Sequence, residues 1–165
     1  EEVGWLSFRV LKFIPKDPPK PADAGGSAVQ AVPGRIKPPR GQDNAWWWDM
    51  AAEGKLGIQR CTNCGALRHP PRPMCGECGS MEWETIESSG RGTIASFTVL
   101  THLQFPGYNY PLIIILVDLE EGTRLTSELV DCAPEAVDFG LAVEMVIHED
   151  PDGFKLPVFK LAGGA

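Results

Sequence analysis

Residues 61–79 read CTNCGALRHPPRPMCGECG, and this stretch decides how the surrounding chain folds. It contains two Cys-x-x-Cys-Gly units that are ten residues apart. A Cys-x-x-Cys turn directs two sulfur atoms toward one centre, and the glycine after each unit permits the positive φ that lets backbone N–H groups face the thiolates. Two such turns complete a tetrahedron of sulfur. We therefore predict one structural metal ion, bound by Cys61, Cys64, Cys75 and Cys78.

Zinc is the predicted metal, and iron is the alternative, because tetrahedral thiolate sites hold either. Four protein ligands leave no open position for water, so the site is structural rather than catalytic. Disulfides are the other use of paired cysteines, but Cys-x-x-Cys pairs around a Pro-rich loop favour metal ligation. The gap is shorter than the roughly 15–20 residues of a common zinc ribbon, which indicates a compact rubredoxin-like form. Cys132 lies outside the pattern and is predicted to be a small buried apolar residue.

A tryptophan-rich helix is predicted just before the cysteines. Asp43 or Asn44 can cap it, and it runs to about residue 53, where Gly54 ends it. Neighbouring helix positions lie about 100° apart, so three consecutive tryptophans cannot bury on one surface. Either two bury within the domain and one is incidental, or the helix docks on another subunit, because exposed tryptophans are typical interface anchors. The residues concerned are Trp46, Trp47 and Trp48.

Residues 1–42 differ in character from the rest of the chain. Residues 3–14, VGWLSFRVLKFI, predict a strand, and residues 15–41 are rich in proline and glycine without apolar periodicity. The latter pattern is typical of an extended, poorly packed linker. Because a lone strand is not stable in water, we interpret residues 1–42 as the end of an upstream domain followed by a boundary.

Five β-like runs follow the cysteine cluster, at residues 93–102, 112–119, 124–130, 142–148 and 157–161. Between the third and fourth runs, residues 133–140 (APEAVDFG) predict a short helical turn, where an OB barrel often carries its helix. The spacing suits a small closed barrel. The predicted fold is mainly β, with a docking helix (43–57), a zinc ribbon (58–87) and a five-stranded OB-fold barrel (88–165).

Charge is unevenly distributed along the chain. Residues 1–40 hold seven Lys/Arg against four Asp/Glu, whereas residues 91–165 hold four against eleven. An acidic barrel repels phosphodiester backbones, so we predict no nucleic-acid partner, although zinc ribbons and OB barrels often bind nucleic acids. The longest apolar run, residues 112–117, is far shorter than the roughly 20 residues of a membrane helix. We predict a cytoplasmic protein without membrane contact.

No motif of a reaction centre occurs. The sequence lacks a Gly-x-Ser-x-Gly elbow, a phosphate loop and a dinucleotide fingerprint. Ser96, His102 and Asp118 could be combined as nucleophile, base and acid, but their spacing does not support this. His69 falls in the ribbon loop and His148 at a strand end. We therefore predict no catalytic residue.

A loop between the first two barrel strands, residues 103–111 (LQFPGYNYP), carries three aromatic rings. In an OB fold this loop commonly flanks the binding face. The rings either cover the barrel end or stack on a partner or ligand. They belong to Phe105, Tyr108 and Tyr110.

Several longer stretches resemble a known family. They are WWWDMAAEGKLGIQRC (46–61), ESSGRGTIASFTVLTH (87–102), YPLIIILVDLEEGTRL (110–125) and LPVFKLA (156–162). Together with the cysteines and the Pro70-Pro71-Arg72 and Gly90-Arg91-Gly92 motifs, they resemble the acyl-CoA-associated zinc-ribbon and OB-fold family, domain of unknown function 35. The resemblance covers residues 43–162.

This resemblance implies an accessory role. Members of the family accompany thiolase-like enzymes, including lipid-transfer-protein-type aldolases, and help to shape the coenzyme A (CoA) thioester site; a heterotetramer is plausible. Residues 1–42 further resemble the end of a MaoC-type hotdog domain, as in hydratase subunits of bacterial steroid side-chain degradation. That likeness implies retro-aldol cleavage of a steroid side-chain CoA thioester. The alternatives are a nucleic-acid module and a stand-alone CoA-thioester enzyme.

If the chain helps to form a CoA site, the chemistry of side chains outside the metal site suggests two further roles. Arg72 and Arg91 could meet the phosphates of CoA, although each is equally plausible as a surface residue or a salt-bridge partner. The partner interface is expected to include the aromatic residues of the helix and the first barrel loop, which are Trp46, Trp47, Trp48, Phe105, Tyr108 and Tyr110.

Overall fold

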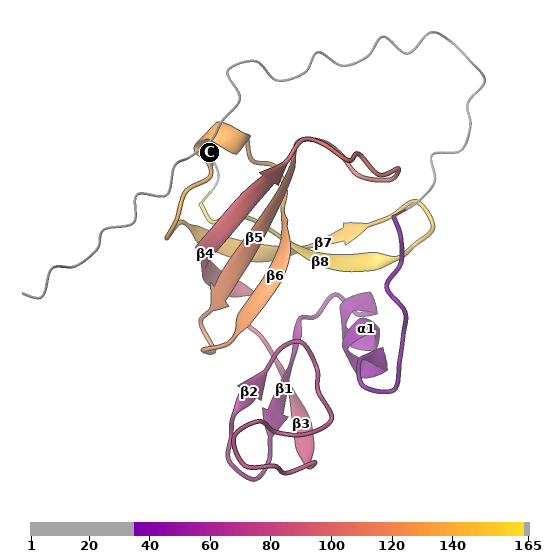
Figure 1. The fold of residues 1–165 in the computed structure, drawn as a ribbon, viewed down its shortest axis with the longest axis vertical. Helices are drawn as coiled ribbons and strands as arrows, with labels where there is room; N and C mark the ends of the chain where they lie inside the picture. The colour runs from indigo at the N-terminus through magenta and orange to yellow at the C-terminus, as the bar shows by residue number, and fades with distance from the viewer. Residues whose placement is uncertain (1–34, 164–165) are drawn as a thin grey trace, which may run out of the picture. The chain divides into compact units, whose positions relative to one another are not determined.

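The structure is a computed structural model that describes residues 35–163. One helix, α1 (Ala45–Ala52), precedes eight strands and a short 3-10 helix, η1 (Pro134–Ala136) (Figure 1). The predicted strand at residues 3–14 lies outside the described residues. Within residues 35–163, no helix is long and apolar enough to cross a membrane. The strands are β1 (Gly57–Cys61), β2 (Leu67–Arg68), β3 (Trp83–Glu87), β4 (Arg91–Leu100), β5 (Leu112–Leu119), β6 (Arg124–Leu129), β7 (Ala142–Glu149) and β8 (Lys155–Leu161).

The last five strands form a closed barrel in the order β4-β5-β6-β8-β7, and β7 pairs back onto β4. All neighbours are antiparallel except β6 and β8, which meet in a short parallel contact. Along β5, burial alternates so that Ile113, Ile115 and Val117 are buried and the residues between them are half-buried. This alternation places one face of each strand in the barrel core. The predicted mainly β fold with a five-stranded OB barrel is confirmed.

Gly92 shows why glycine is needed where the chain enters the barrel. It pairs with the end of β5, and a Cβ atom at this position would lie 2.4 Å from the carbonyl oxygen of Asp118. No side chain fits in that space. Further along β4, the register with β5 shifts between Ile94 and Ser96, and such a bulge bends a strand around a barrel.

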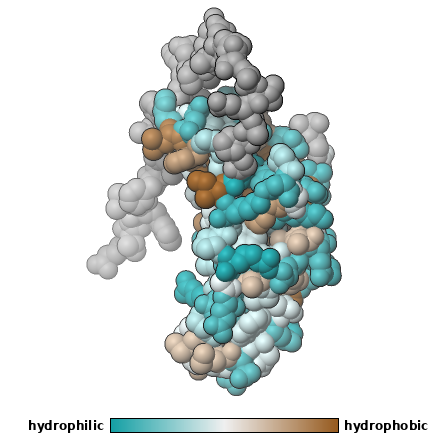
Figure 2. Space-filling view, turned by 90° about the vertical axis from the view of Figure 1, so that its right-hand side faces the viewer, coloured by the Kyte–Doolittle hydropathy of each residue, from teal (hydrophilic) through white to brown (hydrophobic). Residues whose placement is uncertain are grey.

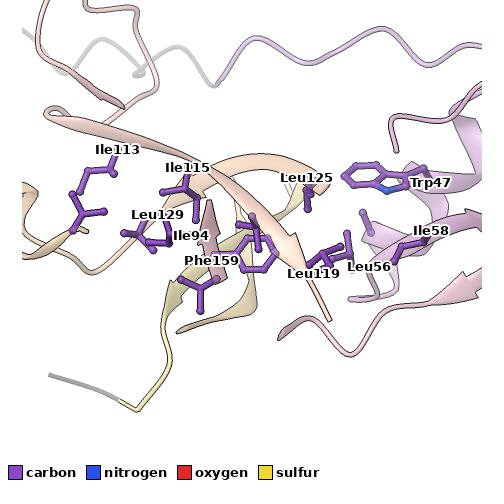
Figure 3. Close-up of a cluster of buried hydrophobic side chains, with 14 residues drawn as sticks. Trp47, Leu56, Ile58, Ile94, Ile113, Ile115, Leu119, Leu125, Leu129 and Phe159 are labelled. Atoms are coloured by element: carbon purple, nitrogen blue, oxygen red, sulfur yellow. The ribbon is translucent and has the colours of Figure 1, made fainter. Parts of the chain in front are cut away.

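The ribbon sheet has the order β2-β1-β3 and is antiparallel. Its inner residues do not form a core of their own. Leu56 and Ile58 are 1% exposed and belong to one buried cluster with Leu125 and Phe159 of the barrel, as Figure 3 shows. Trp47 of α1 joins the same cluster. Helix, ribbon and barrel therefore share one hydrophobic core.

Helix α1 ends as the sequence predicts but begins differently. Gly54 has φ +84° and its N–H donates to the Ala51 carbonyl, which is the expected glycine stop. At the other end, Asn44 makes no side-chain bond to the helix. Its Oδ1 instead accepts the N–H of Gly41 at 2.7 Å, and its Nδ2 donates to the Pro39 carbonyl at 3.2 Å. The Asn44 side chain thus holds the preceding chain in a turn.

Residues 35–40, which we call the basic segment, contain no helix or strand, and only Arg35 among them is buried. Arg35 is 8% exposed and pairs with Glu128 and Asp150, and Lys37 pairs with Asp152. Arg40 pairs with Asp49 of α1. At the described end of the predicted linker, Arg35 and Lys37 therefore meet acidic residues of the barrel.

Candidate functional site

The four cysteines of the predicted metal site come together. Their sulfur atoms all lie within 4.8 Å of one another, with 3.6 Å between Cys61 and Cys78 and 3.6 Å between Cys64 and Cys75. A tetrahedral ion with metal–sulfur bonds of about 2.3 Å requires sulfur atoms roughly 3.8 Å apart. The four thiols therefore fit a single tetrahedral metal ion, with no position left for a fifth group.

Each pair of cysteines sits on a tight turn closed by glycine. Gly65 and Gly79 have φ values of +76° and +72°, as predicted, and their N–H groups donate to the carbonyls of Cys61 and Cys75. The strand β1 ends on Cys61, so the first cysteine turn begins directly at the end of a strand. Cys61 and Cys75 are buried, whereas their two partners are exposed.

Polar groups favour the thiolate at two of the four cysteines, whereas hydrogen bonds with neighbouring cysteines and burial raise the pKa of Cys64 to about 12. The side-chain amide of Asn63 and the backbone N–H of Ser80 lower the pKa of Cys78 to about 6. Backbone N–H groups, above all that of Cys64, lower the pKa of Cys61. Thiolates are the form that binds a metal, so the turns prepare the site for an ion. Asn63 is a contributor that the sequence analysis did not single out.

The three tryptophans all find contacts inside this chain. Trp47 is 8% exposed, and its ring centroid lies 4.6 Å from that of Trp48 in an edge-to-face arrangement. Trp46 packs on Trp83 of β3 at 5.3 Å, and Trp48 packs on Phe154 at 5.4 Å. The rings radiate to the barrel, the ribbon and the β7–β8 loop, as the angular spacing requires. Their predicted role in binding a partner remains a proposal.

The aromatic loop between β4 and β5 is held by a hydrogen bond within it and by a contact with Arg35. Tyr110 accepts the N–H of Phe105 on its hydroxyl at 2.9 Å, and the Arg35 guanidinium lies 5.0 Å from the centre of the Tyr108 ring. Phe105 is 53% exposed and Leu103 is 83% exposed. The tyrosines therefore shape the loop, while its tip offers apolar side chains to solvent.

Exposed apolar side chains elsewhere are scattered. Figure 2 shows one face of the molecule, on which hydrophilic residues predominate and hydrophobic ones form small separate patches. Among the described residues, the other exposed large apolar side chains are Ile36, Met74, Met81, Trp83 and Phe139. A partner surface would have to combine several elements.

The two arginines expected near CoA have different surroundings. Arg91 makes a two-pronged ion pair with Glu120, at 2.7–3.0 Å, so an anionic ligand would have to compete with that carboxylate. Arg72 is exposed, and within residues 35–163 its side chain has no ion-pair partner. Of the two arginines, Arg72 is the freer to bind a ligand.

Cys132, outside the metal site, is half-buried against the barrel core.

The residues weighed as a catalytic triad do not come together. Asp118 is ion-paired with Arg124 at 2.5 Å, and Ser96 lies opposite Leu116 in the β4–β5 register. Within the described part of the chain, no hydrogen bond joins Ser96, His102 and Asp118. They therefore form no catalytic triad in this structure.

A cleft of about 640 Å³ lies between α1, the loop after β2, and strands β6 and β8. Its walls include Trp47, Trp48, His69, Pro70 and Leu156. Burial lowers the pKa of His69 to about 4, so the imidazole is neutral near pH 7. The cleft is thus a mainly apolar surface with a neutral histidine.

Two features were missed by the sequence analysis. One is the buried ion cluster of Arg35, Glu128 and Asp150, in which the three side chains are 7%, 14% and 4% exposed. The other is Arg68, which is 9% exposed. The opposite charges of the basic segment and the barrel could have predicted the first cluster. Nothing in the periodicity of residues 61–79 pointed to the second.

The geometry defines a class of protein, a metal-ribbon protein with a helix and an OB-fold barrel built on one core. Residues 48–84 match the family model for the ChsH2 rubredoxin-like zinc ribbon domain, and residues 85–148 match that for the ChsH2 C-terminal OB-fold domain. A DUF35 domain-containing scaffold protein of Methanocaldococcus jannaschii is 39% identical over 103 residues, which are 59% of this chain and 72% of that protein. The chain belongs to this DUF35 family of zinc-ribbon and OB-fold proteins.

Longer bacterial relatives match as well. A probable enoyl-CoA hydratase alpha subunit of Thermomonospora curvata is 38% identical over 98% of this chain. A 3-oxo-4,17-pregnadiene-20-carboxyl-CoA hydratase alpha subunit of Mycobacterium tuberculosis is 36% identical over 92% of it. The chain spans about half the length of these two relatives, 49% and 47%.

A solved structure shares the fold. The structure described as the Ltp2-ChsH2(DUF35) aldolase contains a chain that is 41% identical, with a TM-score of 0.73. The match covers 76% of this chain and 99% of that one.

Proposed function

We propose that this chain is a non-catalytic accessory subunit that binds a thiolase-like enzyme and helps to form its acyl-CoA site. The observation that carries the proposal is its similarity, along 99% of that chain, to a chain of the Ltp2-ChsH2(DUF35) aldolase. The scaffold description of the archaeal relative points the same way. The closed four-cysteine site also supports it, because four protein ligands leave a metal no position for substrate.

In this proposal the metal is zinc, and it holds the ribbon rather than taking part in a reaction. Zinc is supported by the four-sulfur geometry and by the zinc ribbon family to which residues 48–84 belong. The partner is a lipid-transfer-protein-type thiolase homologue, with which the chain forms a heterotetramer. Contacts with this partner involve the exposed tip of the aromatic loop and the outer faces of Trp46 and Trp48.

The reaction proposed for the complex is retro-aldol cleavage of a steroid side-chain CoA thioester. The named substrate of the Mycobacterium tuberculosis hydratase relative is such a thioester. Since aldolases cleave what hydration produces, a hydratase and an aldolase would act in succession on one side chain. Arg72 is the stronger candidate to contact CoA, because Arg91 is held by Glu120.

Co-expression with a thiolase homologue from the same source tests the proposal. We expect a stable heteromer on size-exclusion chromatography, and carbon–carbon bond cleavage that requires both proteins. Cleavage should be followed with a steroid side-chain hydroxyacyl-CoA and with a short straight-chain hydroxyacyl-CoA as the comparison substrate.

Two results would count against the proposal. Turnover of the CoA thioester by the rigorously purified chain alone would show that it is an enzyme in its own right. Absence of any complex at micromolar concentrations of both proteins would remove the accessory role.

A further inference from the structure

The ribbon sheet contains a buried charge without a partner. Five of the seven arginines in residues 35–163 pair with carboxylates, whereas Arg68 and Arg72 do not. Arg68 is 9% exposed, and none of its three guanidinium nitrogens has a hydrogen-bond partner. Burying an ionised group without a counter-charge is strongly unfavourable. A residue held in this way implies that an acceptor is supplied from outside the chain.

The register of the ribbon places Arg68 on the same face as Gln59, a residue that lines a cleft. Arg68 lies directly opposite Gln59 in the β1–β2 pair, and opposed residues of an antiparallel pair project from the same face. Gln59 lines a cleft of about 250 Å³, together with Arg72 and Trp83. Arg68 therefore projects from the ribbon face on which Gln59 and Arg72 line this cleft, and is not itself a lining residue.

The other groups in this cleft are mostly hydrogen-bond donors or apolar. The Oε1 atom of Gln59 accepts the backbone N–H of Arg72 at 2.9 Å, so its amide nitrogen is left to donate. Met81 and Trp83 supply apolar walls. The exception is Asp43, an acidic residue that also lines the cleft and would compete for a guanidinium group. The cleft is thus suited to a small group that carries oxygen atoms and negative charge.

We propose that the ribbon face around Arg68, Arg72 and Gln59 is a binding site for an oxyanion. Resting on the proposed function, two sources share this chemistry: a carboxylate of the partner subunit and a phosphate of CoA. Guanidinium groups bind both through paired N–H donors. The free chain carries the unfavourable buried charge, and the anion relieves it when the complex forms.

The test compares Arg68→Met and Arg72→Met with Arg60→Met in the full chain. Arg60 lies on the same ribbon and pairs with Glu84 in an exposed position, so its replacement removes one charge without touching the cleft. Thermal unfolding of the chain alone should show Arg68→Met to be as stable as the natural chain or more stable. In the same variant, the affinity for whichever of CoA or the partner subunit supplies the anion should fall about thirtyfold.

Two titrations identify the source of the anion. Isothermal titration with CoA, on the natural complex and each variant complex, measures phosphate binding. Titration of each variant chain with the thiolase homologue measures contact with a partner carboxylate. If the variants lose affinity only for CoA, the anion is a phosphate of CoA. If they lose affinity only for the thiolase homologue, the anion is a carboxylate of the partner. Asp43→Asn in the otherwise natural chain should strengthen the same binding that the arginine variants weaken, because it removes the competing carboxylate.

The opposite outcomes overturn the proposal. If Arg68→Met lowers the melting temperature markedly and leaves both affinities unchanged, Arg68 is a structural residue. If all three variants are folded and bind CoA and the partner equally well, the cleft binds no anion. Failure of the natural chain to form any complex would instead overturn the proposed function.

Discussion

The guanidinium of Arg35 lies 2.5 Å from Glu128 and 3.4 Å from Asp150, and these side chains are 7%, 14% and 4% exposed. His148 contacts the same oxygen of Asp150, with 3.1 Å between Nε2 and Oδ1. One residue of the basic segment therefore balances the buried carboxylate of Asp150 and the half-buried carboxylate of Glu128, which lie in separate parts of the barrel. The same guanidinium lies over Tyr108, so it also links the segment to the aromatic loop.

Removal of this arginine should destabilise the barrel. Arg35→Ala leaves two carboxylates buried without their cation, and breaking a buried pair in this way costs about 3 kcal/mol. Arg40→Ala is the matched control, because its pair with Asp49 is exposed and should contribute little. Urea unfolding of both variants measures the difference. Equal free energies of unfolding for the two would contradict the role given to Arg35.

Metal binding should depend on the four ribbon cysteines alone. We expect about one zinc ion per chain by elemental analysis, and loss of the metal with local unfolding of the ribbon in Cys75→Ser. Cys132→Ser should keep the metal, because Cys132 lies outside the cluster. A purified chain with a disulfide between these cysteines, or with bound iron instead, would refute the zinc assignment.

The free energy of unfolding should decrease as pH falls through the range between the folded and unfolded pKa values of His69. Burial lowers the pKa of His69 to about 4, whereas the unfolded chain has a histidine pKa of about 6.5. Between these values the unfolded state binds the additional proton, so the free energy of unfolding decreases as pH falls from about 6.5 to 4. Part of this decrease should be absent in His69→Gln.

The measurement is urea unfolding at pH 7 and pH 5 for the natural chain, His69→Gln and His102→Gln. His102 is exposed, so its replacement should leave the decrease unchanged. Differences between variants isolate His69 from Asp43 and Glu128, which line the same cleft, and from the metal ligands. An identical decrease in all three proteins would show that His69 titrates normally.

Aromatic residues should separate into two groups when replaced by alanine. Phe105→Ala should weaken binding to the thiolase homologue by about 2 kcal/mol, if Phe105 is a hot spot, and leave the fold intact, because the side chain is 53% exposed. Trp47→Ala should instead lower stability by about 3–5 kcal/mol, because this ring lies in the shared core.

Surface plasmon resonance and thermal unfolding measure these two effects. Phe139→Ala serves as a control for removing an exposed ring, since Phe139 is 49% exposed on a different loop. Equal affinity of Phe105→Ala and the natural chain would exclude the loop tip from the interface.

The local features of this protein could be predicted from sequence. The metal site depends on residues at most 17 positions apart, from Cys61 to Cys78, held by two turns of fixed geometry. The barrel strands follow from alternation and turn residues; β5, for example, spans the expected residues 112–119. The glycine stop of α1 is equally local. Such features depend on residues close together along the chain, so they can be predicted from the sequence pattern.

Other features depend on contacts between distant residues, and no local pattern reports them. Arg35 reads as part of a linker, yet it is buried because Glu128, 93 positions away, needs a cation. Which tryptophan enters the core is set by where the barrel lies against α1, and Trp47 alone of the three is buried there. Arg68 looks like an ordinary ribbon residue until the β1–β2 register places it opposite Gln59. Burial and charge balance are properties of the assembled fold, because only packing decides which groups lose water and what they meet in its place.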